Sequence, residues 1–456
     1  CAPDTTLRFS RPIVVASPTI IDGAGKIILS GQSRTSLFLV RPSIILTLQD
    51  VVIEDAVLSD LAPFGLRFYG SVIRGGGAVT LDHVRIRRSS TPIAVHELIA
   101  SNSIFEGNTG PVIFSNKVTL SRSQLYSTVG PPLVSQGFPG FSLHATNPQD
   151  VFTADNARIT DSTFLGNGPI LWRGNLEIER SFFTSNHSDG RGASRAGALL
   201  VGGNITIAET SFSKNTGVRG GAIGFFEGEL SLRRARFEDN EATEEGGALY
   251  FEDNPDLASA GPARNAQVAV SYSKFQRNKA PLGGAISLGK TDGTRPAGIL
   301  NLRTSVLAQN TSVTDGGAVY GGVGNVNLFR AVLTANSAAN GGAVAMSVSS
   351  DGALNITNSL VVNNTSGTGG AIEAWKLRVT NTTIAANNGI GLAFQRASLT
   401  DIRAARGSAT FENSIVANNS GPNCARSPIV ARNVTLIDGG NNLQFPGASC
   451  GETIVS

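Results

Sequence analysis

The sequence is poor in the residues that usually carry redox, metal or aromatic chemistry. Its 456 residues include 3 Cys, 4 His, 1 Met and 2 Trp, and most of its aromatic residues are Phe. No His has a Cys or another His at the spacing of a zinc site, so the sequence predicts no metal site and no cofactor. It also lacks a Gly-x-Ser-x-Gly elbow and a phosphate-binding loop, which excludes the enzyme classes that those motifs define.

Charge excess and long hydrophobic runs are absent as well. A total of 37 Lys and Arg residues against 34 Asp and Glu residues gives a net charge of +3. Composition alone therefore indicates neither a nucleic-acid nor a membrane partner. No run of 18 apolar residues occurs, so no membrane-spanning helix is predicted. Glycine is abundant, with 53 residues, which is typical of chains rich in turns and strands.

What the sequence does contain is repetition. A hydrophobic anchor, two variable residues and then Asn recur along the chain, and Gly-Gly-Ala followed by an aliphatic residue recurs between several of these phrases. The anchor spacing is close to about 25 residues, with insertions, and predicts a solenoid of about 15 coils. The anchors and their Asn partners include Phe164/Asn167, Phe183/Asn186, Phe212/Asn215, Phe237/Asn240, Phe275/Asn278, Leu307/Asn310, Leu333/Asn336, Leu360/Asn363, Ile384/Asn387 and Ile415/Asn418.

One repeat, residues 220–245, indicates the local structure. Alternating apolar residues predict three short strands, around Ile223, around Leu230 and around Phe237, followed by a variable loop at 241–245. A propeller blade would need four strands in about 40 residues, and a leucine-rich repeat would show its Leu consensus. Three short strands per coil therefore favour an all-β fold, a parallel β-helix.

The repeated residues have structural explanations. We expect each anchor to point inward and to stack on its equivalents, and each Asn to adopt a left-handed turn conformation and hydrogen-bond the Asn of the next coil. Gly-Gly permits a sharp bend and a close approach of two backbones. The predicted turn ladder comprises Asn186, Asn215, Asn240, Asn278, Asn310, Asn336, Asn363 and Asn387.

The chain is predicted to divide into three segments. Residues 1–60 form an N-terminal cap and the first coils, residues 61–420 the β-helix repeats, and residues 421–456 a terminal coil and C-terminal cap. Two irregular insertions, at 129–156 and 253–266, interrupt the repeats. Long loops on a regular scaffold often carry function, so both insertions are candidate binding loops.

The pairing of Phe-x-x-Asn with Gly-Gly-Ala-Ile resembles the repeats of the polymorphic outer membrane proteins of chlamydiae and of the wider group of bacterial right-handed parallel β-helix proteins. The opening segment, residues 19–29, is similar to the entry coils of that group. The resemblance covers residues 15–450, roughly. It implies a right-handed β-helix, display at the outer membrane or cell surface, and adhesin activity.

The three cysteines suggest two further features. A chain that begins at Cys1 resembles a mature bacterial lipoprotein, in which this Cys carries the lipid; a proteolytic start is the alternative. Cys424 and Cys450 lie about one repeat apart. They favour a disulfide that closes the last coil, with two free thiols as the alternative.

An enzymatic role requires separate consideration, because many parallel β-helices cleave polysaccharides. Hydrolysis needs two carboxylates on one face, and Glu177 and Glu179 flank Ile178 so that both should point outward. An ordinary solvated face is the simpler explanation. The sequence therefore favours a non-enzymatic, lipid-anchored protein of the extracellular envelope surface, an adhesin, scaffold or accessory subunit, with a carbohydrate-active enzyme as the alternative.

Charged positions leave the partner open. The position three residues before the anchor holds Asp161, Arg180, Glu209 and Arg234 in successive coils, which favours a ladder of exposed ion pairs. An arginine-rich stripe including Arg85, Arg87 and Arg88 would instead bind an acidic glycan. An envelope protein is the other partner that we consider; no nucleic acid is predicted.

Overall fold

The computed structural model describes residues 5–56, 72–90, 93–109, 112–126, 133–135, 155–188, 190, 195–251, 266–289, 298–322, 324–347, 352–394, 407–426, 434–452 and 454. The chain divides into two compact units: unit 1 comprises Cys1–Ser194 and Ala198–Ser211, and unit 2 comprises Arg195–Gly197 and Phe212–Ser456. Cys1 and most of the two predicted insertions, all but residues 133–135, 155–156 and 266, lie outside the described residues. Lipid attachment and loop function therefore stay predictions.

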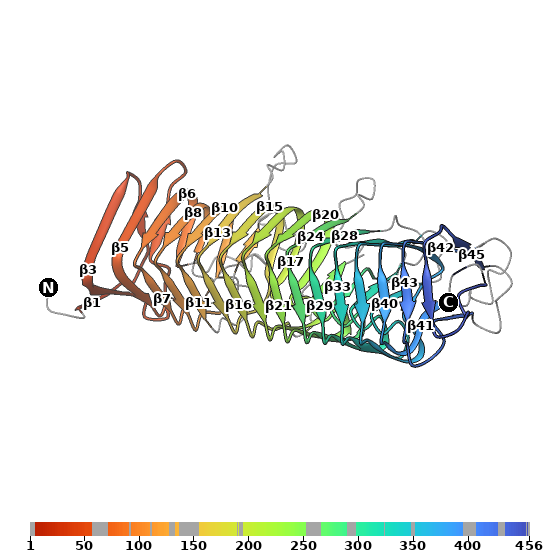
Figure 1. Cartoon of the computed structure of the whole chain (residues 1–456). Helices are drawn as coiled ribbons and strands as arrows, with labels where there is room; N and C mark the ends of the chain where they lie inside the picture. Colours follow the sequence, from red (N-terminus) through yellow and green to blue (C-terminus); the bar gives the residue numbers. More distant parts are fainter. Residues whose placement is uncertain are drawn as a thin grey trace, which may run out of the picture. The chain divides into compact units, whose positions relative to one another are not determined.

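All regular elements in the described part of the chain are β-strands, and they pair in parallel within each unit (Figure 1). Each strand pairs with its equivalent in the next coil, which confirms the predicted all-β parallel β-helix. Within the described ranges, no helix is long and apolar enough to cross a membrane.

Unit 1 contains one ladder of long strands and one of short strands. The long ladder consists of β3 (Thr19–Ser30), β5 (Ile45–Glu54), β6 (Ile73–Asp82), β8 (Ile93–Ser101), β10 (Ile113–Ser121), β13 (Asp155–Thr160), β15 (Ile170–Glu179) and β17 (Leu199–Ala208). The short ladder consists of β7 (Arg85–Arg87), β9 (Ile104–Glu106), β11 (Gln124–Tyr126), β14 (Thr163–Leu165) and β16 (Phe182–Thr184). The remaining strands are β1 (Thr5–Arg8), β2 (Ile13–Val15), β4 (Phe38–Val40) and β12 (Leu133–Ser135). Strand β18 (Ser211–Ser213) spans the sequence boundary between the units.

Unit 2 contains four ladders. Ladder A consists of β20 (Ile223–Arg233), β24 (Gln267–Ser271), β28 (Ile299–Arg303), β32 (Asn325–Phe329), β36 (Leu354–Thr357), β39 (Lys376–Thr380), β42 (Gly407–Glu412) and β45 (Val434–Asp438). Ladder B consists of β21 (Arg236–Glu238), β25 (Lys274–Gln276), β29 (Val306–Ala308), β33 (Val332–Thr334), β37 (Leu360–Val362), β40 (Thr383–Ala385), β43 (Ile415–Ala417) and β46 (Leu443–Phe445). Ladder C consists of β19 (Thr216–Arg219), β22 (Glu241–Glu245), β26 (Lys279–Leu282), β30 (Thr311–Asp315), β34 (Ser337–Ala338) and the start of β38 (Thr365–Glu373). Ladder D continues from β20 through β23 (Leu249–Phe251), β27 (Ile286–Ser287), β31 (Val319–Gly321), β35 (Val344–Met346) and the end of β38 to β41 (Asn388–Phe394) and β44 (Cys424–Arg426).

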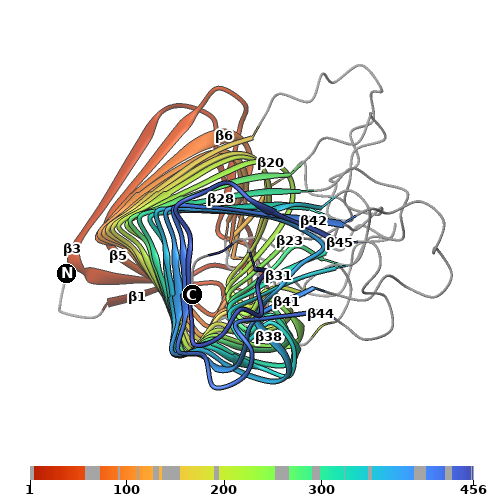
Figure 2. The same cartoon turned by 45° about the vertical axis from the view of Figure 1, so that its right-hand side comes forward.

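Two of the three strands predicted for residues 220–245, around Ile223 and Leu230, are one continuous strand, β20. Ladder C is an addition to the predicted strands. Residues 241–245, expected to form a variable loop, are strand β22, because their backbone pairs with both neighbouring coils. The Glu241 N–H donates to the Asn215 carbonyl at 2.9 Å. In Figure 2, β28 and β42 lie along one side of the coils of unit 2, β23 and β31 along a second side, and β38 along a third.

The anchors form the inner columns that the repeat predicts. In unit 1 the rings of Phe164 and Phe183 are parallel within 5°, with centroids 4.6 Å apart. In unit 2 Phe237 and Phe275 repeat this arrangement at 4.6 Å, and both are fully buried. Stacked rings of this kind combine burial with a favourable aromatic contact, so the columns are a main source of stability.

A single left-handed residue turns the chain on each side of the ladder B strands from β21 to β43. Arg234 and Asp239, with φ of 51° and 56°, flank β21. At the second corner the left-handed residue, Asp239, immediately precedes the ladder residue Asn240. The prediction that the ladder Asn itself is left-handed is therefore wrong. The side chain of the left-handed residue points outward, so residues other than Gly are accepted there at a modest conformational cost. The Gly-Gly corners differ: Gly246 has a φ of 63°, and a Cβ on Gly247 would lie 2.1 Å from the Gly284 carbonyl oxygen.

The buried Asn side chains connect one coil to the next. The Asn278 Oδ1 accepts hydrogen bonds from the Asn240 backbone N–H at 3.1 Å and from the Asn240 Nδ2 at 2.9 Å. The Asn278 Nδ2 donates to the Phe237 carbonyl and to the Asn310 Oδ1, both at 3.0 Å. Each Asn thereby satisfies polar groups that the turn would otherwise leave unpaired inside the protein.

The register near the C-terminus differs from the predicted one by a single residue. Val361 is buried and aligns with Leu333, whereas Leu360 is 37% exposed. Asn364 accordingly takes the ladder position, accepting from the Asn336 N–H at 3.0 Å, and the predicted Asn363 lies outside the ladder at the corner. The same shift places Val416, and not Ile415, in the anchor column.

A second buried ladder uses Ser and Thr two residues before the anchors. The Ser273 Oγ accepts from the Ala235 N–H at 3.0 Å and donates to the Ser271 carbonyl at 2.9 Å. The Ser273 N–H in turn donates to the Ser305 Oγ at 3.0 Å. The sequence carries a signal for this ladder, because most anchors follow a Ser or Thr by two residues.

The C-terminal end of unit 2 is closed by a disulfide and a buried amide. Cys424 and Cys450 are joined across a sequence separation of 26 residues. Gln444 takes the anchor position after Val416 and is fully buried. Its Nε2 donates to the Gly451 carbonyl at 2.7 Å, and its Oε1 accepts from the Cys450 N–H at 2.9 Å. A polar side chain therefore ends the hydrophobic column and fixes the segment that covers it.

Candidate functional site

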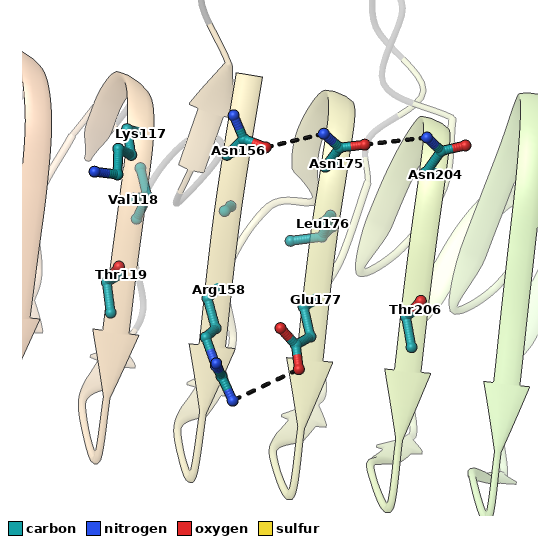
Figure 3. Close-up of a pocket in the computed structure, with 11 residues that line it drawn as sticks. Lys117, Val118, Thr119, Asn156, Arg158, Asn175, Leu176, Glu177, Asn204 and Thr206 are labelled. Carbon is teal, nitrogen blue, oxygen red and sulfur yellow. Dashed lines mark hydrogen bonds and ion pairs between the residues drawn. The ribbon is translucent and has the colours of Figure 1, made fainter. Parts of the chain in front are cut away.

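The outer face of unit 1 carries a groove over four neighbouring strands, β10, β13, β15 and β17. Its volume is about 540 Å³. Figure 3 shows the side chains that line it. Strand alternation explains its lining, since successive residues point to opposite faces of the sheet. The groove is lined by Lys117, Val118, Thr119, Asn156, Ala157, Arg158, Asn175, Leu176, Glu177, Asn204 and Thr206.

Parallel register arranges the polar lining in two rows. Asn156, Asn175 and Asn204 align in the first row. Arg158 and Glu177 align in the second row. Between the two rows lies a third whose side chains point into the core, including the buried Leu176. The polar residues of the two outer rows therefore contribute little to the core, and core packing does not restrict which residues occupy these positions.

The three amides are held in one orientation by each other. The Asn175 Nδ2 donates to the Asn156 Oδ1 at 2.9 Å, and the Asn204 Nδ2 donates to the Asn175 Oδ1 at 3.1 Å (Figure 3). A row of this kind is ordered before any ligand arrives, so binding to it would cost little side-chain entropy. It offers both donors and acceptors at the spacing of the strands.

The cationic side chains of the groove form ion pairs with partly exposed carboxylates. The Arg158 Nη2 lies 3.6 Å from the Glu177 Oε1, and the two side chains are 57% and 48% exposed. The Lys117 Nζ contacts the Glu97 Oε1 at 2.6 Å. Exposed pairs contribute little to stability, so a charged ligand can compete for these groups.

The two carboxylates predicted for hydrolysis do not both line this groove. Both lie on β15, in alternate positions of one face, as the sequence indicated. Glu177 lines the groove, whereas Glu179 is not among the lining residues and its carboxylate contacts the Arg180 guanidinium. A glycosidase places both carboxyl groups around the scissile bond. Among its described lining residues, the groove has one carboxylate beside a guanidinium.

The corner charges next to the groove form ion pairs across coils. The Arg180 Nε donates to the Asp161 Oδ1 at 2.7 Å and the Nη2 to the Oδ2 at 3.0 Å. This hydrogen-bonded guanidinium lowers the pKa of Asp161 below its ordinary value of 3.8. Arg87 and Arg88 of the predicted stripe are likewise paired, because both guanidinium groups lie 2.7 Å from the Glu54 carboxylate and Arg88 also contacts Asp55.

Sequence reasoning found Glu177 but missed the amides around it. A signal existed: Asn, two residues and then Ile recur at Asn156, Asn175 and Asn204. The repeat of Asn at a fixed offset before an inward Ile indicates a row on the outer face of the sheet.

Comparison with known proteins adds a relative and several structural likenesses. No family model matches the chain. The chain is 29% identical over 294 residues to the "Probable outer membrane protein pmp7" of Chlamydia pneumoniae. That match covers 62% of this chain and 28% of the relative, so the chain spans well under two thirds of the relative's length.

The structural likenesses are broad in coverage and low in score. The periplasmic alginate epimerase AlgG is aligned over 95% of this chain and 85% of its own, with a TM-score of 0.33 and 10% identity. The Streptococcus pneumoniae surface protein and adhesin PfbA is aligned over 95% and 90%, with a TM-score of 0.30 and 11% identity. At these scores neither likeness carries an argument about activity.

Proposed function

We propose that this chain is a non-enzymatic binding protein of the bacterial cell surface, with the groove of unit 1 as its site for an acidic polysaccharide. The observation that supports this most directly is the ordered row of three amides beside the cation Arg158. The row is polar and lies on the outer face of the sheet rather than in the core, so its amides are available to a ligand.

The chemistry of the groove matches a sugar chain that carries carboxylates. Sugar hydroxyls donate and accept hydrogen bonds, as do the amides of Asn175 and its neighbours. The Arg158 guanidinium can bind a uronate carboxylate through two hydrogen bonds. Because its pairing with Glu177 is exposed and 3.6 Å long, little stability is lost when a ligand carboxylate takes over the guanidinium.

Placement at the cell envelope is supported by the similarity to a chlamydial outer membrane protein. At that location, the groove would serve an adhesin, or a scaffold or accessory subunit that holds the chain against envelope polysaccharide. Multiple copies on one surface would strengthen weak individual contacts through avidity.

The test is calorimetric titration of the protein with a soluble polyuronate and with an uncharged polysaccharide of similar length. We expect Arg158→Gln to weaken polyuronate binding at least about tenfold, or about 1.4 kcal/mol, and to leave the uncharged polymer unaffected. Asn175→Ala should weaken binding of both polymers. Arg378→Gln is the matched control, since Arg378 is 65% exposed and faces Glu412 at 3.8 Å on the outer side of ladder A in unit 2.

Two results would contradict the proposal. Absence of binding to every polysaccharide tested, or equal loss in Arg158→Gln and Arg378→Gln, would remove the groove as the site. New reducing ends or unsaturated products, abolished by Glu177→Gln, would instead support the carbohydrate-active enzyme.

A further inference from the structure

The corner between ladder A and ladder B of unit 2 gathers cations and aromatic rings over four consecutive coils, from β20 to β33. Three positions of each coil meet there: the last residue of the ladder A strand, the left-handed corner residue and the first residue of the ladder B strand. We call the side chains at these positions the cationic ridge. Coil by coil they are Arg233, Arg234 and Arg236; Ser271, Tyr272 and Lys274; Arg303, Thr304 and Val306; and Phe329, Arg330 and Val332.

The geometry of the corner makes the ridge convex. Its corner residues are left-handed, with φ of 53° at Tyr272 and 52° at Arg330, so the chain bends within one residue and the side chains point away from the core. Backbone hydrogen bonds stack one corner on the next. The Tyr272 N–H donates to the Arg303 carbonyl at 3.2 Å, and the Thr304 N–H donates to the Phe329 carbonyl at 2.9 Å. The side chains therefore follow one outer edge, at about 4.8 Å from coil to coil.

The ridge is strongly positive. Its positions include six cations and no acid. Arg236 and Lys274 lie 3.8 and 3.9 Å from one shared carboxylate, that of Glu238, and such long, exposed pairs are weak. Across the described ranges, neither Arg303 nor Arg330 forms an ion pair. Exposed cations without a fixed counter-charge attract an anionic partner.

An aromatic ring orders the two unpaired cations. The guanidinium carbon of Arg303 lies 5.6 Å from the centroid of the Phe329 ring, and that of Arg330 lies 5.2 Å from it. A guanidinium on an aromatic face keeps N–H donors available to a phosphate or carboxylate. Because the ring holds both groups before a ligand arrives, binding costs less side-chain entropy.

Shape and composition indicate which anion the ridge fits. A convex edge does not enclose a sugar chain, and the ridge lacks the amides that face sugar hydroxyls in the groove of unit 1. It offers apolar groups instead: Tyr272 is 64% exposed, and Val306 and Val332 are half-buried beside Arg303 and Arg330. On an anionic membrane, cations contact the headgroup phosphates while Tyr and aliphatic side chains enter the headgroup region.

We propose that the cationic ridge docks unit 2 onto a membrane surface that contains anionic lipid. Arg303 and Arg330 bind headgroup phosphates, and Tyr272 enters the headgroup region. Each cation of such a surface contributes about fivefold to binding, and salt weakens the attachment. The docking uses no residue of the groove in unit 1 and does not rest on the function proposed for it.

Co-sedimentation of the full chain with lipid vesicles tests the proposal. Wild type should bind vesicles of phosphatidylcholine and phosphatidylglycerol in equal parts, lose this binding at about 1 M salt, and bind pure phosphatidylcholine far more weakly. Arg303→Gln combined with Arg330→Gln should weaken binding to the mixed vesicles about thirtyfold. Tyr272→Ser should weaken it with the salt dependence unchanged, because no charge is removed.

Lys376→Gln combined with Arg378→Gln is the matched control. It removes two cations from outward positions of β39, on ladder A of unit 2 beyond the ridge, and should bind vesicles like wild type. Arg158→Gln should also bind vesicles like wild type, which separates this test from that of the groove. Melting curves equal to that of wild type would show that the variants are folded.

Three results would overturn the proposal. The first is equal binding of wild type to mixed and to pure phosphatidylcholine vesicles. The second is an equal loss in the ridge variant and in the matched control, which would reduce the effect to net charge. The third is a wild type that binds no vesicle but retains a soluble polyuronate through Arg303 and Arg330, which would make an acidic sugar chain the partner of the ridge.

Discussion

Replacing Asn364 by Ala should destabilise unit 2 far more than the same replacement at the adjacent Asn363. The Asn364 Oδ1 accepts from the Asn336 backbone N–H at 3.0 Å and from the Asn336 Nδ2 at 2.9 Å. Its Nδ2 donates to the Leu333 carbonyl at 3.0 Å. Truncation leaves a buried N–H without its acceptor and removes further hydrogen bonds, at a cost of about 3 to 5 kcal/mol.

Asn363 offers a control of identical chemistry one residue away. Its side chain is exposed, and its backbone is left-handed with a φ of 57°. Ala335 and Ala386 hold the equivalent corner in the neighbouring coils at 55°, so Ala is accepted there. The substitution should cost about 1 kcal/mol, from the left-handed conformation alone.

The assay is unfolding in guanidinium chloride followed by the fluorescence of Trp375, in a Trp172→Phe background. Trp375 is buried in unit 2, and Trp172 is the only other Trp of the chain, in unit 1. Because repeat arrays can unfold in stages, hydrogen exchange at the Asn336 amide gives a second, local measurement. Equal destabilisation by the two variants, or a larger effect at Asn363, would refute the assigned register and the role of the ladder.

Three further predictions rest on other contacts of unit 2. Phe237→Ala should lower the free energy of unfolding of unit 2 by about 3 to 5 kcal/mol, because the ring is fully buried between two stacked Phe rings. Chemical denaturation measures this change, and a loss no larger than that of a surface Ala substitution would contradict the prediction. Cys424→Ser with Cys450→Ser should cost about 3 kcal/mol, and reducing agent should bring wild type to the same midpoint but leave the variant unchanged. The Arg277 guanidinium, hydrogen-bonded to Asp239, lowers the pKa of Asp239 below 3.8. The ionised Asp239 carboxylate therefore stabilises the fold at pH values above its ordinary pKa, and this stabilisation is lost as the pH falls through the lowered pKa. In thermal melts from pH 7 to about pH 2, Asp239→Asn should lack the loss of stability that protonation of Asp239 causes in wild type.

The fold was predictable because its period is marked by residues that the core requires. The phrase of Phe237 and Asn240 fixes an inward ring and a buried amide, and it recurs often enough to define coils. The register failed at residues 360 to 364 because Leu360 and Val361 are both apolar and two Asn residues follow. Both registers satisfied the phrase, and Ser359, two residues before the true anchor, was the residue that could have decided between them.

The groove was less predictable, because proximity between coils is not visible along the chain. Asn156 and Asn175 are 19 residues apart in sequence, yet their amides are hydrogen-bonded. An outward position has no hydrophobic requirement, so no periodic apolar signal identifies it. Glu177 and Glu179 were found because charge is conspicuous, whereas the amides that orient the groove resemble ordinary turn residues.

The separation of inward and outward positions explains how one fold carries two different surfaces. In each short or long strand the core fixes alternate residues, such as Leu176 in unit 1 and Val361 in unit 2, which are buried by their neighbours. The residues between them can change without loss of packing. Because parallel register repeats every change at the same height in the next coil, a single type of outward residue becomes a row, and two rows become a surface. Amides and an arginine give unit 1 a polar groove, and arginines with aromatic residues give unit 2 a cationic ridge; both follow from the same stacking rule applied to different outward residues.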